Sequence, residues 1–245
     1  MIDIENQLIE LLPPTDRLHL LAACEPVQLV LAEVLCEPGQ PTPYVYFPID
    51  GFISLVALID GKPALEVGMV GREGMLGARL ALGVVTAPAR ALVQGTGAAW
   101  RIGSDAFWRE LQGSVALQDV LNRYLYVLMT QLATSAACLH FHLIAPRLAR
   151  WLLMRQDRAH SDSFRVTQEL VAHMLGVRRV GITAAAGILQ RCGLIKYHRG
   201  DVTVLNRRGL EAAACSCYAA DQRAYAEILE AEDKNGLLRP QNMHY

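Results

Sequence analysis

The stretch from Val166 to Leu205 constrains the fold more than any other part of the chain; its sequence is VTQELVAHMLGVRRVGITAAAGILQRCGLIKYHRGDVTVL. Apolar residues recur at helical spacing before and after Gly176, and glycine is the residue that a turn after a helix end favours. Thr167 is suited to cap the first helix, and a second helix begins near Arg178. Two short helices joined by a glycine-containing turn form a helix-turn-helix.

The residues after the second helix favour a β-hairpin. Leu194–Tyr197 and Val202–Leu205 are short β-prone runs around an Arg-Gly-Asp turn, so the whole stretch predicts a winged helix-turn-helix. On the second helix the predicted inner stripe is Ile182, Ala185 or Ala186, and Leu189. The opposite face presents Arg178, Arg179, Thr183, Ala184 and Gln190.

The distribution of charge indicates that this region binds a polyanion. The chain has a formal net charge of −1, but residues 146–208 contain twelve Arg or Lys against four Asp or Glu, a balance of +8. The remainder has 11 basic and 20 acidic residues, a balance of −9. A strongly basic segment on an acidic body is typical of a nucleic-acid-binding module, although winged helices also serve as protein-binding modules.

The start of the second helix is where we expect contact with double-stranded DNA. Aligned peptides place about half a positive charge at a helix N-terminus, and two adjacent arginines add to it. A helix that enters the major groove end-on presents such arginines to phosphates and guanine edges. The small residues Gly181, Ala184 and Gly187 would permit close approach. The expected DNA-binding residues are Thr167, Arg178, Arg179, Thr183, Arg191, His198 and Arg199.

The rest of the chain divides into a β-rich part and a long helix. Residues 1–23 favour a helix, with Ile4, Leu8, Leu11 and Leu12 on one side, and Val27 to Ile102 holds short β-prone runs between turns such as IDGK at residues 59–62. Residues 115–144 contain no Gly or Pro and are helical in pattern throughout. The predicted domains are an effector domain at 1–113, a dimerisation helix at 114–145, the winged helix at 146–220 and a tail at 221–245. Ala145–Pro146 is the candidate hinge.

The long helix carries a heptad-like apolar seam that favours a parallel homodimer over a helix buried in a monomer. The seam positions are Leu121, Leu125, Leu128, Leu132, Ser135 or Ala136, and Leu139, of which we expect the five leucines at the dimer interface.

Other classes of protein find less support in the sequence. It contains no nucleophile elbow, phosphate-loop lysine or His-Glu-x-x-His motif, so we do not expect an enzyme. No apolar run has the length of a membrane span, and the acidic start lacks the basic head of a secretory signal, so we expect no membrane association and a cytoplasmic protein. Six scattered cysteines are expected to be reduced thiols there.

The arrangement resembles the Crp/Fnr superfamily of bacterial transcription regulators over residues 20–220. The most specific similarity is TQELVAHMLGVRRVGITAAAGILQRCGLI, and VGREGMLG at Val70–Gly77 also looks like the roll of this family. The resemblance implies an α+β fold with a cyclic-nucleotide-binding-like β-roll, a dimerisation helix, a winged helix-turn-helix, a palindromic operator and contact with RNA polymerase. In the family pattern Arg178 replaces a Ser, Arg179 matches an Arg, and Val180 replaces a Glu, while Ala184 replaces a further Arg. We therefore expect a different operator sequence.

The same resemblance points away from the effectors and cofactors that are familiar in the family. Gly77-Ala78 lacks the Glu that would hold a ribose, so we do not expect cyclic AMP; Arg90, Leu132 and Ala133 are the candidate effector-binding positions. Cys24 and Cys36 are too few for an iron–sulfur cluster, and His140 and His142 are ordinary at a helix end, so haem is not expected. Cys215 and Cys217 supply only two of the four ligands of a zinc site, and we expect them to be packing residues, with no metal or other cofactor.

These observations together predict a homodimeric DNA-binding regulator with a recognition helix at residues 178–192 and an unidentified effector. The alternative is a nucleotide- or small-molecule-binding sensor scaffold that acts through protein contacts.

Overall fold

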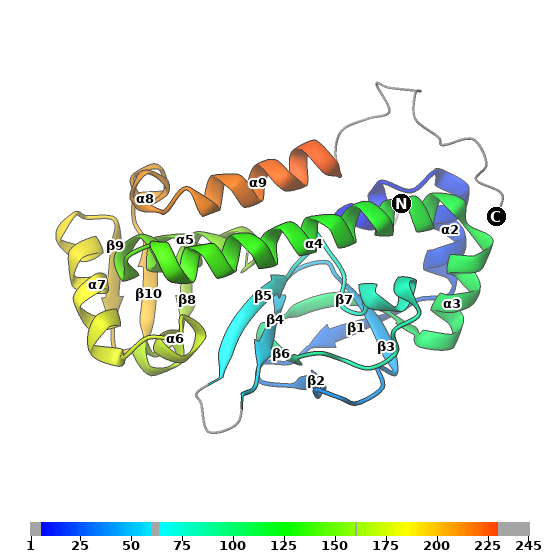
Figure 1. Ribbon diagram of the computed structural model, residues 1–245, viewed down its shortest axis with the longest axis horizontal. Helices are drawn as coiled ribbons and strands as arrows, with labels where there is room; N and C mark the ends of the chain where they lie inside the picture. Colours follow the sequence, from blue (N-terminus) through cyan, green and yellow to red (C-terminus); the bar gives the residue numbers. More distant parts are fainter. Residues whose placement is uncertain (1–5, 60–63, 160, 230–245) are drawn as a thin grey trace.

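The computed structural model describes residues 6–59, 64–159 and 161–229. The molecule is organised around the long helix α4 (Val115–Phe141). A β-roll lies on one side of α4, the last helix α9 (Cys217–Ile228) lies on the other, and a winged helix lies beyond the C-terminal end of α4 (Figure 1). The predicted combination of roll, long helix and winged helix-turn-helix is confirmed.

Two antiparallel sheets form the roll. One has the order β1 (Glu25–Leu29), β7 (Gly97–Gly103), β3 (Tyr44–Pro48). The other has the order β2 (Val34–Cys36), β6 (Arg90–Gly95), β4 (Phe52–Ala57), β5 (Leu65–Val70). Successive side chains of a strand point to opposite faces, and Ile53, Val70 and Val93 point between the sheets and form part of the core there. The expected IDGK hairpin signal falls between β4 and β5, but residues 60–63 lie outside the described residues.

The expected single N-terminal helix is wrong. Two short helices, α1 (Gln7–Glu10) and α2 (Pro14–Ala22), are separated near Pro13. Proline lacks an amide hydrogen and clashes with the preceding turn, whereas it is favoured at the first position of a helix, which Pro14 occupies in α2. The predicted apolar side is correct for Leu8 and Leu12, which are buried beside α3 (Ser104–Gly113) and the 3-10 helix η1 (Ala78–Leu82); Ile4 lies outside the described residues.

The long helix ends earlier than expected. Ser114 caps α4 by accepting a 3.0 Å hydrogen bond from the amide of Leu117, and the helix ends at Phe141, before the predicted end at residue 145. The next helix, α5, spans Ile144–Ala159, so Pro146 lies in its first turn, where a missing amide hydrogen costs little. The break between the two helices is therefore at His142 and Leu143 rather than at Ala145–Pro146.

The first half of α4 belongs to the core of its own chain. Leu121, Tyr124 and Val127 are fully buried against the roll and the N-terminal helices. The Tyr124 hydroxyl accepts a hydrogen bond from the amide of Met75 (3.2 Å), and a Cβ at Gly74 would overlap that hydroxyl. Leu121 consequently has no surface left for a partner, which corrects its assignment to the dimer interface.

The C-terminal part comprises β8 (Ser163–Arg165), α6 (Gln168–Met174), α7 (Arg179–Arg191), β9 (Ile195–His198), β10 (Asp201–Val204), α8 (Arg207–Ala213) and α9. Strand β8 pairs with β10 and extends the expected two-stranded wing to three strands. Helix α9 packs along α4 and is joined to α5 by a 2.7 Å ion pair between Arg150 and Asp221. The predicted boundary at residues 220/221 falls within α9, so it is not a domain boundary.

Helix α5 also fastens the winged helix to the roll. The buried Arg158 forms a 2.6 Å ion pair with Glu73, which lies in the turn after β5. Trp151 donates its indole N–H to Glu66 of β5 (2.8 Å). The guanidinium of Arg155 lies over the Phe52 ring and donates to the side chain of Gln94. Residues of both parts share one apolar core, so the two pack as a unit.

Candidate nucleic-acid interface

Helices α6 and α7 form the helix-turn-helix that the sequence predicts. Thr167 caps α6 by accepting a hydrogen bond from the amide of Leu170 (3.1 Å). Gly176 has φ +62°, the left-handed conformation that glycine adopts easily after a helix. The predicted inner stripe is confirmed, since its members are buried against α5 and the wing: Ile182, Ala185, Ala186 and Leu189.

The start of α7 is exposed and positively charged. Arg178 is the N-cap residue and Arg179 is the first residue of the helix, and both side chains are exposed. Arg178 has no side-chain capping hydrogen bond, although a Ser, Thr, Asp or Asn at this position would stabilise a helix by about 1 kcal/mol. Cations are also disfavoured at the positive end of a helix. Local stability therefore does not explain this pair of arginines.

Among the residues that the structure describes, no acidic side chain pairs with the exposed arginines of α7 and the wing. Within the described part of the chain, no carboxylate lies within ion-pair distance of Arg178, Arg179, Arg191 or Arg199. The arginines of α5 differ in this respect, because Arg158 is buried, Arg150 is partly buried, and both pair with a carboxylate. Exposed positive charge is thus found on α7 and the wing. Other basic residues that contribute to the balance of +8, such as Arg150 and Arg158, instead form ion pairs within the protein.

Other residues expected at the interface have structural roles as well. The Thr183 hydroxyl donates to the side chain of Gln168 (2.6 Å), which links α7 to α6. Gln190 accepts a hydrogen bond from the backbone amide of Tyr197 (2.7 Å) and so fixes the wing. A Cβ at Gly181 would lie 2.7 Å from the Ile144 side chain, so this glycine permits close packing of α7 on α5. This contact does not test the expected role of Gly181 in close approach to DNA.

The wing presents His198 and Arg199 at its tip. Both are exposed, and Arg199 and Gly200 form the turn with φ +51° and +92°. A turn of this kind favours Asn-Gly, and a left-handed arginine carries strain of about 1 kcal/mol or more. Arg191 lies at the opposite end of α7 from Arg179, about 18 Å away at 1.5 Å per residue. The interface expected from the sequence is therefore an exposed surface that extends from the start of α7 to its end and to the wing.

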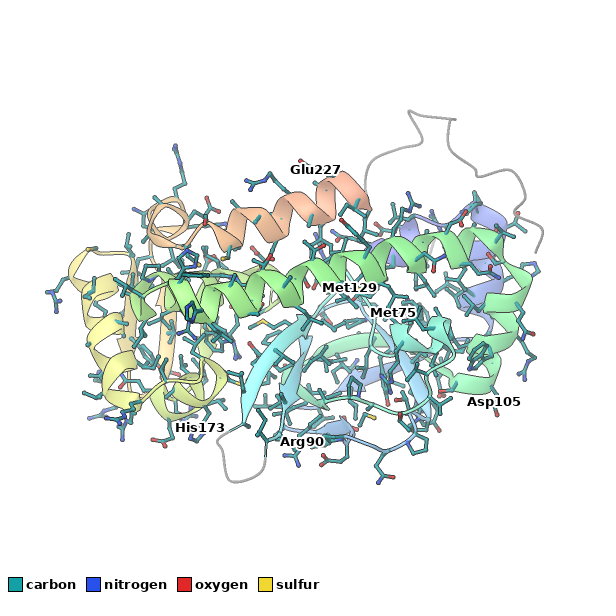
Figure 2. The ribbon with its side chains drawn as sticks, in the orientation of Figure 1. Met75, Arg90, Asp105, Met129, His173 and Glu227 are labelled. Carbon is teal, nitrogen blue, oxygen red and sulfur yellow. The ribbon has the colours of Figure 1, made fainter. Side chains whose placement is uncertain are left out.

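A cavity of about 250 Å³ lies between the roll and α4, and it contains only part of the expected effector site. Leu132 lines it, whereas Arg90 and Ala133 do not. Arg90 lies at the edge of the roll away from α4 and forms a 2.9 Å ion pair with Glu37 (Figure 2). The lining is mostly apolar and includes Met75 and Met129.

Arg79 supplies a polar group in the lining of this cavity. Its Nε donates to the Thr86 carbonyl (2.7 Å), while one terminal nitrogen is buried without a hydrogen-bond partner. Burial lowers the pKa of the Arg79 guanidinium. Arg79 is not among the effector positions expected from the sequence, because the family resemblance points to Arg90 instead.

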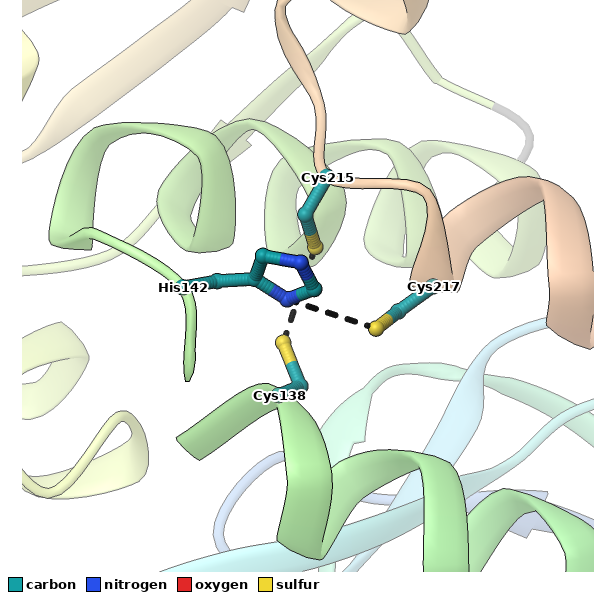
Figure 3. A group of neighbouring side chains, drawn as sticks. All are labelled: Cys138, His142, Cys215 and Cys217. Carbon is teal, nitrogen blue, oxygen red and sulfur yellow. Dashed lines mark hydrogen bonds between the residues drawn. The ribbon is translucent and has the colours of Figure 1, made fainter. Parts of the chain in front are cut away.

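The structure also assembles four side chains that sequence reasoning kept apart. Cys138 and His142 at the end of α4 lie beside Cys215 and Cys217, which precede and begin α9 (Figure 3). The expectation that Cys215 and Cys217 lack two further ligands is therefore wrong, and so is the interpretation of His142 as an ordinary solvent-facing residue. All four are donors that can bind a metal ion.

Among the described residues, no helix combines the length and the apolar character needed to cross a membrane.

Comparisons with known proteins agree with this architecture. Residues 146–213 match the family model of the Crp-like helix-turn-helix domain. A search of curated proteins finds no match. A Crp/Fnr-family transcriptional regulator from Thermus thermophilus, TTHA1359, is similar with a TM-score of 0.64 and 21% identity, over 78% of this chain and 98% of that one.

Two further solved structures have a similar fold. FixK2 from Bradyrhizobium japonicum is similar with a TM-score of 0.66 and 13% identity, over 78% of this chain and 98% of that one. The c-di-GMP-responsive regulator CLP from Xanthomonas campestris has a TM-score of 0.63 and 18% identity, over 78% and 99%. Residues 146–213 therefore form a Crp-like helix-turn-helix domain, and the chain shares its overall fold with these regulators.

Proposed function

We propose that the protein is a homodimeric transcription regulator that reads a two-fold symmetric DNA operator with α7 and the wing. The observation that carries the proposal is the exposed Arg178–Arg179 pair at the start of α7, in a Crp-like helix-turn-helix domain and with no acidic partner among the described residues. Arginines in this position reach phosphates and guanine edges when a helix enters the major groove. A regulator of this kind would act on RNA polymerase at nearby promoters.

Selection of binding sites from a random DNA pool tests this function. A two-fold dimer places its two recognition helices about 34 Å apart, one turn of DNA. We expect the selected sequences to be inverted repeats with half-sites at that spacing. Recovery of no enriched sequence, or of a single unrepeated half-site, would contradict a dimeric operator-binding protein and would favour a scaffold that acts through protein contacts.

The proposed dimer interface is an apolar stripe on the second half of α4. Met129, Leu132 and Leu139 are exposed at helical spacing, with Leu132 at 52%, and Leu125 is half-buried. Leu125 and Leu128, both in the expected seam, pack partly against the core of their own chain. A second copy of α4 would cover this stripe in a parallel dimer.

Replacing Leu132 with Arg is expected to convert the dimer to monomers, because two arginines would face each other across the helix pair. Sedimentation velocity measures the change. Leu18→Arg is the matched control, since Leu18 is also exposed (68%) but belongs to α2, which lies near the N-terminal end of α4 and away from the second half of that helix (Figure 1). A Leu132→Arg protein that sediments as a dimer would place the interface elsewhere.

We propose that the effector is a small apolar molecule with one anionic or acceptor group. The cavity beneath α4 offers mostly apolar side chains and a single buried, unpartnered guanidinium nitrogen at Arg79. A ligand acceptor would satisfy that nitrogen, whereas a cyclic nucleotide would find Ala78 in place of a ribose-binding carboxylate and Arg90 paired with Glu37 outside the cavity.

Anilinonaphthalene sulfonate, an apolar anion, is a suitable probe for this cavity. We expect the fluorescence of the probe to rise on binding to the wild-type protein, and Arg79→Gln to weaken binding by about tenfold or more, because a charge-assisted hydrogen bond contributes about 1.5–3 kcal/mol. Cyclic AMP should not displace the probe. If the probe binds Arg79→Gln as tightly as it binds the wild type, Arg79 is not part of the effector site.

A further inference from the structure

The cluster of Cys138, His142, Cys215 and Cys217 has the composition and geometry of a metal site. Its four potential ligand atoms all lie within 4.8 Å of one another. The Sγ atoms of Cys138 and Cys215 are 3.5 Å apart, and so are the Sγ of Cys217 and the Nδ1 of His142 (Figure 3). In a tetrahedral zinc site with bonds of about 2.0–2.3 Å, neighbouring ligand atoms are separated by roughly 3.3–3.8 Å. The cluster therefore surrounds a point at which an ion could bind with small adjustments of the side chains.

The backbone explains how these residues converge. Cys138 and His142 are one helical turn apart on α4, and His142 is the C-cap residue of that helix. Cys215 lies on the short connection between α8 and α9, Cys217 is the first residue of α9, and the amide of Cys215 donates to the Pro146 carbonyl at the start of α5 (3.3 Å). The three cysteines form a small buried cluster of their own, apart from the three larger apolar cores.

The surroundings favour bound thiolates. Three thiolates and a neutral imidazole around a divalent ion leave one net negative charge. Arg150 lines the same small pocket as Cys138, and it is fixed by its ion pair with Asp221 and by a hydrogen bond to Ser135 (3.3 Å). Three thiolates with one imidazole are a ligand set of structural zinc sites.

We propose that Cys138, His142, Cys215 and Cys217 bind one Zn²⁺ that fastens the start of α9 to the end of α4. The site lies at the break between α4 and α5, at His142 and Leu143, where the dimerisation helix meets the winged helix. Bound metal holds that junction in one arrangement, and loss of the metal releases it. Where the function proposed above holds, the metal also sets the orientation of α7 relative to the dimer axis.

Metal content and cobalt spectroscopy on the reduced, full-length protein test the site without reference to DNA. We expect about one zinc per chain, and the thiolate charge-transfer and tetrahedral d–d bands of Co²⁺ when cobalt replaces zinc. Cys138→Ser/Cys215→Ser and His142→Ala should weaken Co²⁺ binding by at least tenfold. Cys192→Ser, which removes an exposed cysteine elsewhere, is the control and should bind Co²⁺ like the wild type.

Co²⁺ binding to the wild-type protein tests the metal site even if a cluster variant does not fold. A chelator competition with the wild-type protein alone should show saturable binding of one Co²⁺ with thiolate bands. The proposal is overturned if the reduced wild-type protein gives no thiolate bands, if Cys192→Ser loses as much binding as the cluster variants, or if the cysteines of the cluster are recovered as a disulfide from protein kept under reductant. None of these results depends on whether the protein binds an operator.

Discussion

The Arg178→Ala/Arg179→Ala protein is expected to lose most of its affinity for operator DNA while it remains folded and dimeric. A good arginine–base or arginine–phosphate contact contributes about 1–3 kcal/mol, so the loss of two contacts lowers affinity by roughly 30-fold to 20,000-fold. Stability should stay the same or increase, because the change removes two cations from the positive end of α7 and because Arg178 makes no side-chain capping bond.

The matched control removes two other exposed arginines. Arg109 on α3 and Arg223 on α9 are exposed and lie outside the helix-turn-helix, so Arg109→Ala/Arg223→Ala should bind the operator within a fewfold of the wild type. Fluorescence anisotropy measures affinity and thermal unfolding measures stability. If both double variants bind equally well, the N-terminal end of α7 does not contact DNA.

Arg158→Met is expected to destabilise the protein by about 3–5 kcal/mol. Arg158 and Glu73 are both nearly buried, with side-chain exposures of 7% and 15%, and their atoms lie 2.6 Å apart. Removal of one partner leaves the other charge buried without compensation, which is costly. Glu73 also accepts a hydrogen bond from the amide of Gly71 (3.1 Å), so its carboxylate cannot move out of the site without disturbing the turn after β5.

Two further variants show whether Arg158→Met is destabilised by the unpaired charge of Glu73 or by a general loss of packing. Arg101→Met breaks the pair with Glu25 at the surface, where Glu25 is 58% exposed, and should cost only about 0–1 kcal/mol. Glu73→Gln/Arg158→Met removes both buried charges and should recover much of the stability lost in Arg158→Met. The measurement is urea unfolding at equilibrium. Equal destabilisation by Arg158→Met and Arg101→Met would show that the junction between α5 and the roll does not depend on this pair.

The sequence predicts those helices and helix ends that depend mainly on interactions between residues close together in the chain. The period of apolar residues identifies α4, α6 and α7, and Thr167 and Gly176 mark the helix ends where they are found. The charge asymmetry points to the exposed arginines of α7. These features depend on a few neighbouring residues, so a single sequence contains the necessary information.

The features that the sequence does not reveal depend on contacts between distant residues. Cys138 and Cys215 are 77 positions apart, so no spacing rule brings them together with His142 and Cys217. Leu121 and Leu132 share a heptad pattern, yet only the packing of the roll decides that the first is buried in its own chain and the second is exposed. The role of Gly181 in packing on Ile144 likewise depends on how α5 crosses α7.

Operator reading by α7 is tested most directly by an anisotropy titration of the purified protein against a duplex of the selected inverted repeat and a scrambled duplex, at several salt concentrations. We expect tight binding to the repeat, about 1,000-fold or more tighter than to the scrambled duplex, with affinity that falls as salt rises because phosphate contacts release counterions. Equal, weak binding to both duplexes at every salt concentration, with and without an effector probe, would contradict an operator-reading function.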